Sequence, residues 1–246
     1  LWKSRGEYEN NQNLSMEDWA PVIKEIGKNN SMVYITGGEP FLSRDLFQII
    51  PQLKKEKILC GVTTNGVFLT EHANRLIDTG IDFVSVSLDG PKEVHDRSRG
   101  VNGTYDKVIT GLRELIKYRK SNLFPNIKIN CVVSKDNVYL LEEILSIGNS
   151  IGVDEVSFQH LSFFNEQIEN VCNQFSMQNN IEANLIGMKL SNEPLNYDEI
   201  VFLNEFRNNL PYFEKKYRLK VSFKPSVNNY SRYYSFDFPS KKSVCY

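Results

Sequence analysis

The sequence of 246 residues lacks the features that define several large classes of protein. Its four cysteines are widely spaced and form no C-x-x-C pair, which excludes a zinc ribbon and a thioredoxin-type motif. No apolar run approaches the ~20 residues that a membrane-spanning helix needs. The formal net charge of −1 provides no basic field that would hold nucleic acid or an anionic membrane. We therefore expect a cytoplasmic protein with reduced cysteines and neither of these partners.

Composition favours a globular protein with a sizeable core. Hydrophobic residues make up 41% of the chain, charged residues 24% and aromatic residues 12%, which are ordinary values for a soluble protein. The length suits one large domain or two small ones. Cys60 and Cys131 lie in apolar, strand-like runs, where a buried thiol is the simplest interpretation.

Strand-like and helix-like segments alternate along most of the chain. Short runs rich in β-branched and apolar residues predict strands at residues 32–36, 58–66, 82–90, 126–134 and 154–161. Apolar stripes at helical spacing predict helices at residues 16–29, 44–57, 70–80, 104–120 and 138–152. Such alternation with short connections predicts right-handed βαβ units and a parallel sheet. The strands read as apolar on both faces, so we expect them to be buried between helices.

Local signals mark the ends and breaks of these helices. Ser15 is a plausible N-cap, and Asp18 three residues later completes a capping box. Pro51 interrupts the second helical pattern, and Gly80 ends the third.

The pattern weakens after the fifth predicted strand. Residues 162–196 are rich in asparagine and contain no clear strand, so we interpret them as an insertion with loose helical content. Residues 197–217 are helical again, with Pro211 as a kink or break. Residues 219–223 have the pattern of a closing strand, and the remainder is loop-like, with an aromatic stretch at 228–238 that either lines a peptide groove or packs between two domains.

Polar residues follow the predicted strands, in the loops where parallel α/β proteins carry their sites. Asn130 lies in the fourth predicted strand, and the fifth ends in Gln159 and His160. We therefore predict a polar ligand site at this end of the sheet. The loops after the first three strands are TGGEP at residues 36–40, TTNG at 63–66 and SLDGP at 87–91, the last of which continues into a long loop with HDRSRG at 95–100.

These residue types suit a zwitterionic ligand that carries a sugar. Backbone carbonyls exposed by the two glycines of TGGEP can accept hydrogen bonds from an ammonium group, with Glu39 near. Arg99 or Arg97 can make a two-pronged contact with a carboxylate. Ser87 and Asp89 can bond the hydroxyls of a ribose or the carboxylate of the ligand.

Three segments together resemble radical S-adenosylmethionine (SAM) enzymes. They are ITGGEPFL at residues 35–42, VTTNGVFL at 62–69 and VSVSLDGPKEVHDRSRG at 84–100. Within that superfamily the chain is similar to the subgroup with a C-terminal SPASM extension. The resemblance runs from about Trp2 to about Leu161. It implies an α/β fold, a partial (βα)6 barrel of TIM type with parallel strands.

The resemblance also assigns roles to the polar loops. The first segment would line the methionine amino group of SAM, and the third would hold its carboxylate through a serine and an arginine, with an aspartate nearby. Asparagines of two strands would approach the ligand, and the backbone at the end of the fifth strand would cradle the adenine. The cofactor-binding residues implied are Gly37, Gly38, Glu39, Pro40, Asn65, Ser87, Asp89, Arg99, Asn130, Gln159, His160 and Leu161.

The cysteines that define the family are missing from these residues. Members bind a 4Fe–4S cluster with a C-x-x-x-C-x-x-C loop after the first strand, and no such loop occurs here. Because LWKSRGEYENNQNLSMEDW resembles the stretch after that loop, we expect the first strand and the cluster loop just upstream of Leu1. A paralogue that has lost the cluster is the alternative. SVCY resembles the beginning of a SPASM region, so Cys245 is either the first ligand of an auxiliary Fe–S cluster or an ordinary thiol.

The implied organisation has three parts. Residues 1–161 form the radical SAM core, and residues 162–223 add the insertion, the last helix and the closing strand. Residues 224–246 lead toward a SPASM-type region.

The implied activity is reductive cleavage of SAM. A reduced cluster would pass one electron to the sulfonium, and the resulting 5′-deoxyadenosyl radical would abstract hydrogen from a substrate. The SPASM-like features favour a peptide or protein side chain as substrate, with a small molecule as the alternative. A flavodoxin or a ferredoxin would be the electron donor.

Two other functions stay open from the residues alone. One is a cluster-less module that binds SAM or a peptide without catalysis. The other is a barrel hydrolase or isomerase that uses Glu39 and Asp89 as paired carboxylates, although this leaves the glycines and Asn65 without a role. His95 and His160 could each serve as an acid or base, with loop shaping and packing as their structural alternatives.

Overall fold

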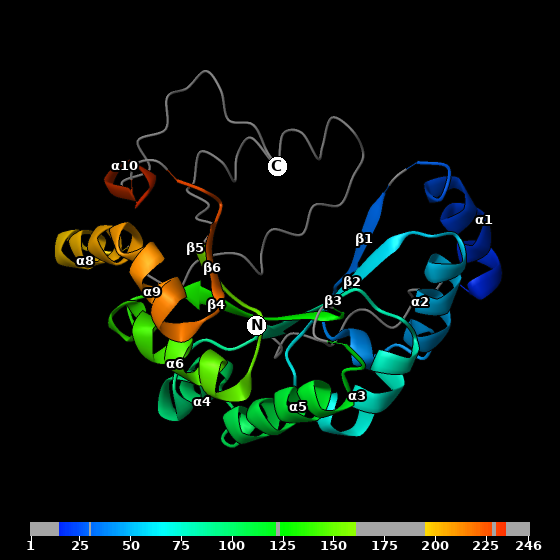
Figure 1. Cartoon of the computed structure of the whole chain (residues 1–246), viewed down its shortest axis with the longest axis horizontal. Helices are drawn as coiled ribbons and strands as arrows, with labels where there is room; N and C mark the ends of the chain where they lie inside the picture. The colour runs from blue at the N-terminus through cyan, green and yellow to red at the C-terminus, as the bar shows by residue number, and fades with distance from the viewer. Residues whose placement is uncertain (1–14, 30, 122–123, 161–194, 228–229, 235–246) are drawn as a thin grey trace, which may run out of the picture.

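The computed structural model describes residues 15–29, 31–121, 124–160, 195–227 and 230–234. Six strands form one parallel sheet in the order of the chain, β1-β2-β3-β4-β5-β6. Figure 1 shows that the sheet is curved and that the helices lie in an arc around its outer, convex side. The predicted α/β fold, a partial barrel with parallel strands, is therefore confirmed. The strands are β1 (Met32–Ile35), β2 (Leu59–Thr64), β3 (Phe83–Ser87), β4 (Asn126–Val133), β5 (Glu155–His160) and β6 (Lys220–Lys224).

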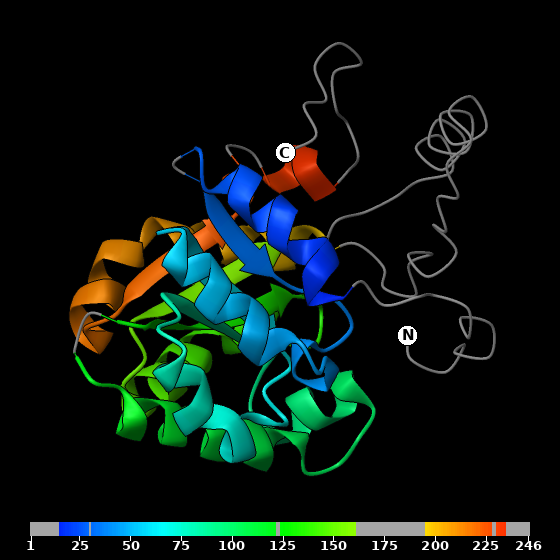
Figure 2. The same cartoon turned by 90° about the vertical axis from the view of Figure 1, so that its right-hand side faces the viewer.

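Helices connect the successive strands and cover the convex side. Figure 2 shows α1 and α2 packed side by side next to β1. Every helix among the described residues is too short or too polar to cross a bilayer. The helices are α1 (Met16–Ile26), α2 (Leu46–Lys55), α3 (Leu69–Asp78), α4 (Lys92–Arg99), α5 (Thr104–Tyr118), α6 (Leu141–Ile151), α8 (Tyr197–Asn208), α9 (Leu210–Tyr217) and α10 (Tyr230–Tyr234), with the 3-10 helices η1 (Pro40–Leu42) and η2 (Val138–Leu140).

The two faces of the sheet differ in polarity. Along β4, Ile127 and Ile129 are fully buried, whereas Lys128 and Asn130 between and after them are half-buried. Because successive side chains of a strand point to opposite faces, the isoleucines pack under the helices and the polar residues line the concave face. The expectation that the strands are apolar on both faces was wrong, since the helices of the described residues cover the convex side and polar side chains line the concave one.

Local signals were correct at several helix ends. The capping box of α1 is present, with the Asp18 amide donating to Ser15 Oγ at 3.3 Å and the Ser15 amide donating to Asp18 Oδ2 at 2.8 Å. Pro211 lies in the first turn of α9, just after α8 ends, so the predicted break is confirmed. Pro51 lies inside α2 without ending it, and the predicted interruption there was wrong.

Two segments expected to be loops contain helices. HDRSRG lies largely in α4, which ends at Gly100 with a left-handed φ of 69°. His95 and Asp96 of α4 are buried, so contacts with the rest of the protein stabilise a helix that has little apolar surface of its own. Likewise, Tyr230 and Tyr234 of α10 are buried in the core, where the loop-like remainder was expected. The predicted insertion lies outside the described residues up to residue 194.

Candidate functional site

The loops after the strands meet at one end of the sheet because all six strands are parallel. Contacts between these loops, described below, bring the predicted segments together at this end. We call this region the rim, and it consists of Gly37, Gly38, Glu39, Thr64, Asn65, Ser87, Asp89, Arg99, Asn130 and Gln159.

Glu39 joins the first loop of the rim to the second. Its buried carboxylate accepts hydrogen bonds from Thr64 Oγ1 at 2.7 Å and from the Asn65 amide at 2.8 Å, and a weaker one from the Phe41 amide at 3.3 Å. Gly37 has a φ of 151°, and a Cβ at this position would meet no atom within 4 Å. Glu39 thus fixes the loop from behind, while the backbone of the two glycines stays exposed and able to accept hydrogen bonds from a ligand.

Replacing Glu39 with glutamine is expected to lower the free energy of unfolding by about 1–3 kcal/mol, because one of the two backbone amides that donate to the carboxylate would face an NH₂ group instead of an oxygen. The Nε2 group of the new side chain cannot accept from the Asn65 amide. Urea unfolding measures the change, and Glu71→Gln on the exposed surface of α3 is the matched control. Equal midpoints for the two variants would contradict the bridging role of Glu39.

Asp89 and Arg99 form a partly buried ion pair. Arg99 Nη2 lies 2.7 Å from Asp89 Oδ2, and the two side chains are 32% and 9% exposed. The Val132 amide of β4 donates to Asp89 Oδ1 at 3.2 Å, so Asp89 is held from two sides. Arg97, the alternative carboxylate ligand, is 62% exposed and lies 3.7 Å from Asp136. The geometry therefore favours Arg99, whose guanidinium is oriented by Asp89 and still partly exposed.

Two buried side chains hold the backbone of Asp89. The Asp89 amide donates to His95 Nδ1 at 3.1 Å, and Asn137 Nδ2 donates to the carbonyls of Asp89 and Val132, both at 2.8 Å. Burial, with a contribution from Arg99, lowers the pKa of His95 to about 4. The ring is therefore neutral at pH 7, as its acceptor role requires. These contacts support the interpretation that His95 shapes the loop around Arg99.

Ser87, Asn130 and Gln159 place hydroxyl and amide groups on the concave face. Ser87 and Asn130 are register partners on β3 and β4, and Asn130 Nδ2 donates to Gln159 Oε1 at 3.2 Å. None of the three side chains is fully buried. Groups of this kind can bond the hydroxyls of a sugar.

Pro40 and His160, which were also predicted to bind the cofactor, have side chains that are buried within the protein. Pro40 is buried at the first position of η1, where it begins the turn. The His160 side chain packs against the aromatic rings of α10, with Nδ1 2.8 Å from Tyr234 Oη, so only its backbone is left for a ligand. Leu161 and Cys245 lie outside the described residues.

The rim fits SAM, but the described residues do not fit an iron–sulfur cluster. Burial raises the pKa of Cys60 to about 12, and burial also raises the pKa of the Cys131 thiol well above its usual range. No group of three His, Cys, Asp or Glu side chains in the described part of the chain is placed to hold a metal ion. In contrast, the rim offers exposed backbone acceptors, an oriented guanidinium and concave hydroxyl and amide groups. These match the ammonium, carboxylate and ribose of SAM.

Two contributors to the rim were not predicted from the sequence. Thr64 lies in the TTNG segment, and its Oγ1 donates to Glu39 and accepts from the Gly66 amide at 3.0 Å. Its position within a predicted site loop was the sequence signal that could have identified it. Asn137 follows β4 in an ordinary turn sequence, and nothing in that sequence indicates that its amide reaches the backbone of Asp89.

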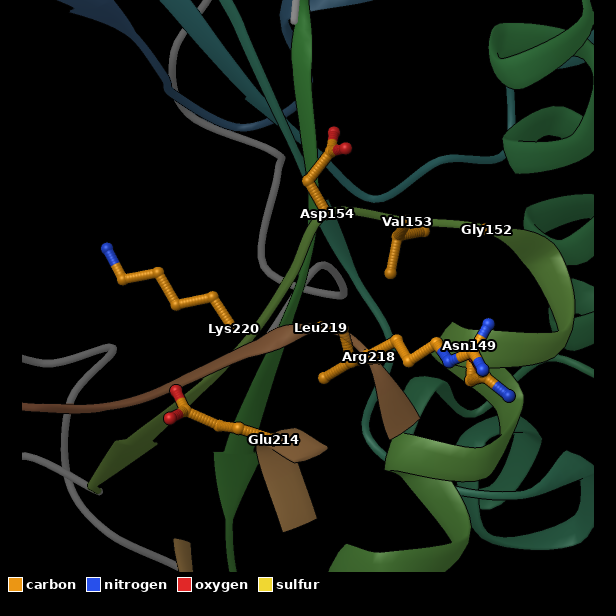
Figure 3. Close-up of a pocket in the computed structure, with 8 residues that line it drawn as sticks. All are labelled: Asn149, Gly152, Val153, Asp154, Glu214, Arg218, Leu219 and Lys220. Carbon is orange, nitrogen blue, oxygen red and sulfur yellow. The ribbon is translucent and has the colours of Figure 1, made fainter. Parts of the chain in front are cut away.

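Two pockets lie away from the rim. The first, of about 580 Å³, lies at the amino ends of β5 and β6 and so at the opposite end of the strands. Figure 3 shows the residues that line it, among them Asp154, Glu214 and Arg218. A second, of about 780 Å³, lies along α4 and the loop after it. Asp154 is occupied in structural contacts, since it pairs with Arg119 at 2.7 Å and accepts from the Ile127 amide at 2.8 Å.

The chain resembles known proteins in sequence and in fold. It is 38% identical over 152 residues to a probable GTP 3′,8-cyclase of Sulfurisphaera tokodaii, covering 60% of this chain and 47% of that protein. An AdoMet-dependent heme synthase of Nitratidesulfovibrio vulgaris is 29% identical over 149 residues, covering 60% of this chain and 38% of that protein. The crystal structure of Streptococcus suis SuiB bound to precursor peptide SuiA has a similar fold, with a TM-score of 0.65, 16% identity, and coverage of 93% and 46%.

These similarities extend over only part of each relative, since the chain spans about half the length, or less, of the curated relatives it matches. The family model of the radical SAM superfamily matches residues 3–148, which is more than half of the chain. Enzymes of this family use SAM and a 4Fe–4S cluster. The chain belongs to the radical SAM superfamily.

Proposed function

We propose that the chain is the SAM-binding part of a radical SAM enzyme that removes a hydrogen atom from its substrate. The observation that carries the proposal is the Asp89–Arg99 pair, which presents a guanidinium at the same end of the sheet as the exposed glycine backbone. In this family, SAM bound to a 4Fe–4S cluster supplies a 5′-deoxyadenosyl radical. We propose that the cluster ligands lie outside the described residues.

The residues of the rim would bind and orient SAM. The exposed carbonyls of Gly37 and Gly38 accept from its ammonium group, and Arg99 donates to its carboxylate. Ser87 and Asn130 bond the ribose from the concave face. Since the ends of an amino acid and the sugar are held at separate points, the orientation of the sulfonium between them is fixed.

The paired-carboxylate hydrolase is disfavoured by the same contacts. The Glu39 carboxylate accepts from Thr64 and Asn65, and the Asp89 carboxylate is paired with Arg99 and bonded to Val132. Both are structural, which leaves neither of them free to transfer protons.

Replacing Arg99 with alanine is expected to weaken SAM binding roughly 10- to 150-fold, the range for losing a hydrogen bond to a charged group. Calorimetric titration with SAM measures the effect. Arg97→Ala is the matched control because Arg97 lies on the same helix, is 62% exposed and faces Asp136 instead of the rim. If both variants bind SAM as the parent chain does, Arg99 does not hold the carboxylate.

The activity itself is tested on the longer natural protein, reconstituted anaerobically with iron and sulfide. The expected result is a brown chromophore and release of 5′-deoxyadenosine when SAM and a reductant such as flavodoxin or ferredoxin are added. Absence of both would exclude a radical SAM enzyme. A peptide substrate is favoured by the likeness in fold to SuiB, and a small molecule by the names of the two curated relatives.

A further inference from the structure

A group of charged side chains lines the concave face below the rim. Lys128 on β4 is in register with Glu155 on β5, which is in register with Lys220 on β6. We call these residues the concave cluster, and it consists of Tyr34, Lys128, Glu155, Lys220, Ser222 and Lys224.

The cluster is continuous with the rim. Lys128 lies two residues before Asn130 on the same face of β4, which places their Cα atoms roughly 7 Å apart at about 3.3 Å per residue. Lys224 is the register partner of Gln159, whose side chain bonds Asn130. A molecule that extends from the rim onto the concave face therefore reaches the cluster.

Lys128 lies at the centre of this face. Its Nζ is 5.6 Å from the centroid of the Tyr34 ring on β1, which is half-exposed and stacks on Phe83. Burial lowers the pKa of Lys128, the ammonium groups of Lys224 and Lys220 lower it further, and the Glu155 carboxylate opposes part of this shift. The half-buried ammonium of Lys128 thus has neighbours from both edge strands of the sheet. They are the Tyr34 ring on β1 and the cations Lys220 and Lys224 on β6.

The single carboxylate of the cluster is already engaged. Ser222 Oγ donates to Glu155 Oε1 at 2.7 Å, and Lys220 Nζ lies 3.9 Å from Glu155 Oε2. Within the described residues, no carboxylate lies within ion-pairing distance of Lys128 or Lys224. Three ammonium groups therefore face one carboxylate, with Lys128 half-buried and Lys220 and Lys224 exposed. An anion that binds between Lys128 and Lys224 relieves the repulsion between their charges.

We propose that Lys128 and Lys224 bind an anionic group, a carboxylate or a phosphate, of the substrate on the concave face. This inference rests on the proposed function, because it takes the rim as the SAM site and the adjoining face as the place of the substrate. The flat Tyr34 ring beside Lys128 adds an apolar surface for the part of the substrate next to the anion. The substrate class is thus an organic acid or a phosphate ester, either free or as part of a peptide.

Binding of small anions to the 246-residue chain tests this proposal without radical chemistry. The chain is labelled with ¹³C at lysine Cε and titrated separately with inorganic pyrophosphate and with citrate. We expect saturable shifts of the Lys128 and Lys224 signals and a dissociation constant at least about 10-fold weaker in Lys128→Met. Lys128→Arg, which keeps the charge, should retain binding. Lys107→Met, on the exposed side of α5, should bind as the parent does.

The two anions also distinguish the source of the negative charge. Binding of pyrophosphate alone assigns a phosphate, binding of citrate alone assigns a carboxylate, and binding of both supports the shared chemistry. Absence of saturable shifts with either anion would overturn the proposal, as would equal affinity in Lys128→Met.

Calorimetry with SAM separates this inference from the proposed function. Lys128→Met should leave SAM affinity unchanged, and a loss there would assign the ammonium to SAM and overturn the inference. If Arg99→Ala leaves SAM affinity unchanged while pyrophosphate still binds through Lys128, the rim assignment fails and the anion site stands.

Discussion

Replacing Asp89 with alanine is expected to lower the free energy of unfolding by about 2–4 kcal/mol and to reduce SAM affinity at least as much as Arg99→Ala does. The substitution leaves Arg99 without its partner and the Val132 amide without its acceptor. Breaking a fully buried ion pair costs about 3–5 kcal/mol, and the 32% exposure of Arg99 reduces this cost because water solvates part of the guanidinium. Urea unfolding and calorimetric titration with SAM measure the two effects.

Two further variants make the Asp89 prediction specific. Asp136→Ala removes the partner of Arg97, which is exposed and lies on α4 like Arg99. This substitution should change the free energy of unfolding by no more than about 0.5 kcal/mol. Asp89→Asn keeps an acceptor for the Val132 amide but removes the charge. Its free energy of unfolding should therefore lie between those of the parent and of Asp89→Ala. An Asp89→Ala chain as stable as Asp136→Ala would show that the ion pair contributes nothing to the rim.

The fold was predictable because each strand and helix carries its own pattern. Apolar stripes and β-branched runs mark the elements that form the convex core, and these patterns depend on burial alone. The prediction failed where contacts distant in sequence decide the structure. Residues 92–99 have little apolar surface and still form α4, because His95 and Asp96 are buried against neighbouring segments. The polar concave face was missed although NIKINCVV of β4 alternates visibly between polar and apolar residues.

The candidate site was predictable to the level of its loops but not of its contacts. Parallel strands place TGGEP, TTNG and SLDGP at the same end of the sheet, independently of the side-chain contacts. The contacts within the rim depend on side-chain geometry. Glu39 accepts from Thr64, and Asp89 pairs with Arg99, whereas Arg97 of the same helix lies near Asp136. The support of Asp89 by Asn137 joins residues 48 positions apart, which no local pattern encodes.

Lowering the pH from 7 to 4 is expected to destabilise the fold through His95 and His160. The Nε2 atom of each ring is buried without a hydrogen-bond partner in the described part of the chain, so a charged, doubly protonated ring would leave its Nε2–H without an acceptor. For His95 the added proton would also fall on Nδ1, which accepts from the Asp89 amide. Burial therefore lowers both pKa values to about 4, with smaller contributions from Arg99 for His95 and Arg207 for His160. An unfolded histidine has a pKa near 6.5.

The unfolded chain therefore binds more protons than the folded chain between pH 6.5 and 4, and stability falls as the pH drops through this window. Each histidine lowers the free energy of unfolding by up to about 3 kcal/mol at pH 4, since one pKa unit corresponds to about 1.4 kcal/mol. Above pH 6.5 neither histidine contributes to the loss of stability. Asp96, whose pKa is lowered to about 2 mainly by the amides of Tyr105 and Gly103, adds to the loss only below pH 4.

Urea midpoints measured between pH 7 and 4 test the size and the position of this loss. His160→Phe, which preserves the aromatic packing against α10, should reduce the pH dependence of stability by the share of one histidine. Proton NMR of the ring Cε1–H signals provides the direct check, because neither His95 nor His160 should titrate above pH 5 in the folded chain. A midpoint near pH 6.5 for either ring would mean that water reaches its Nε2. For His95 it would also mean that the ring is not the neutral acceptor that fixes the Asp89 loop beneath Arg99.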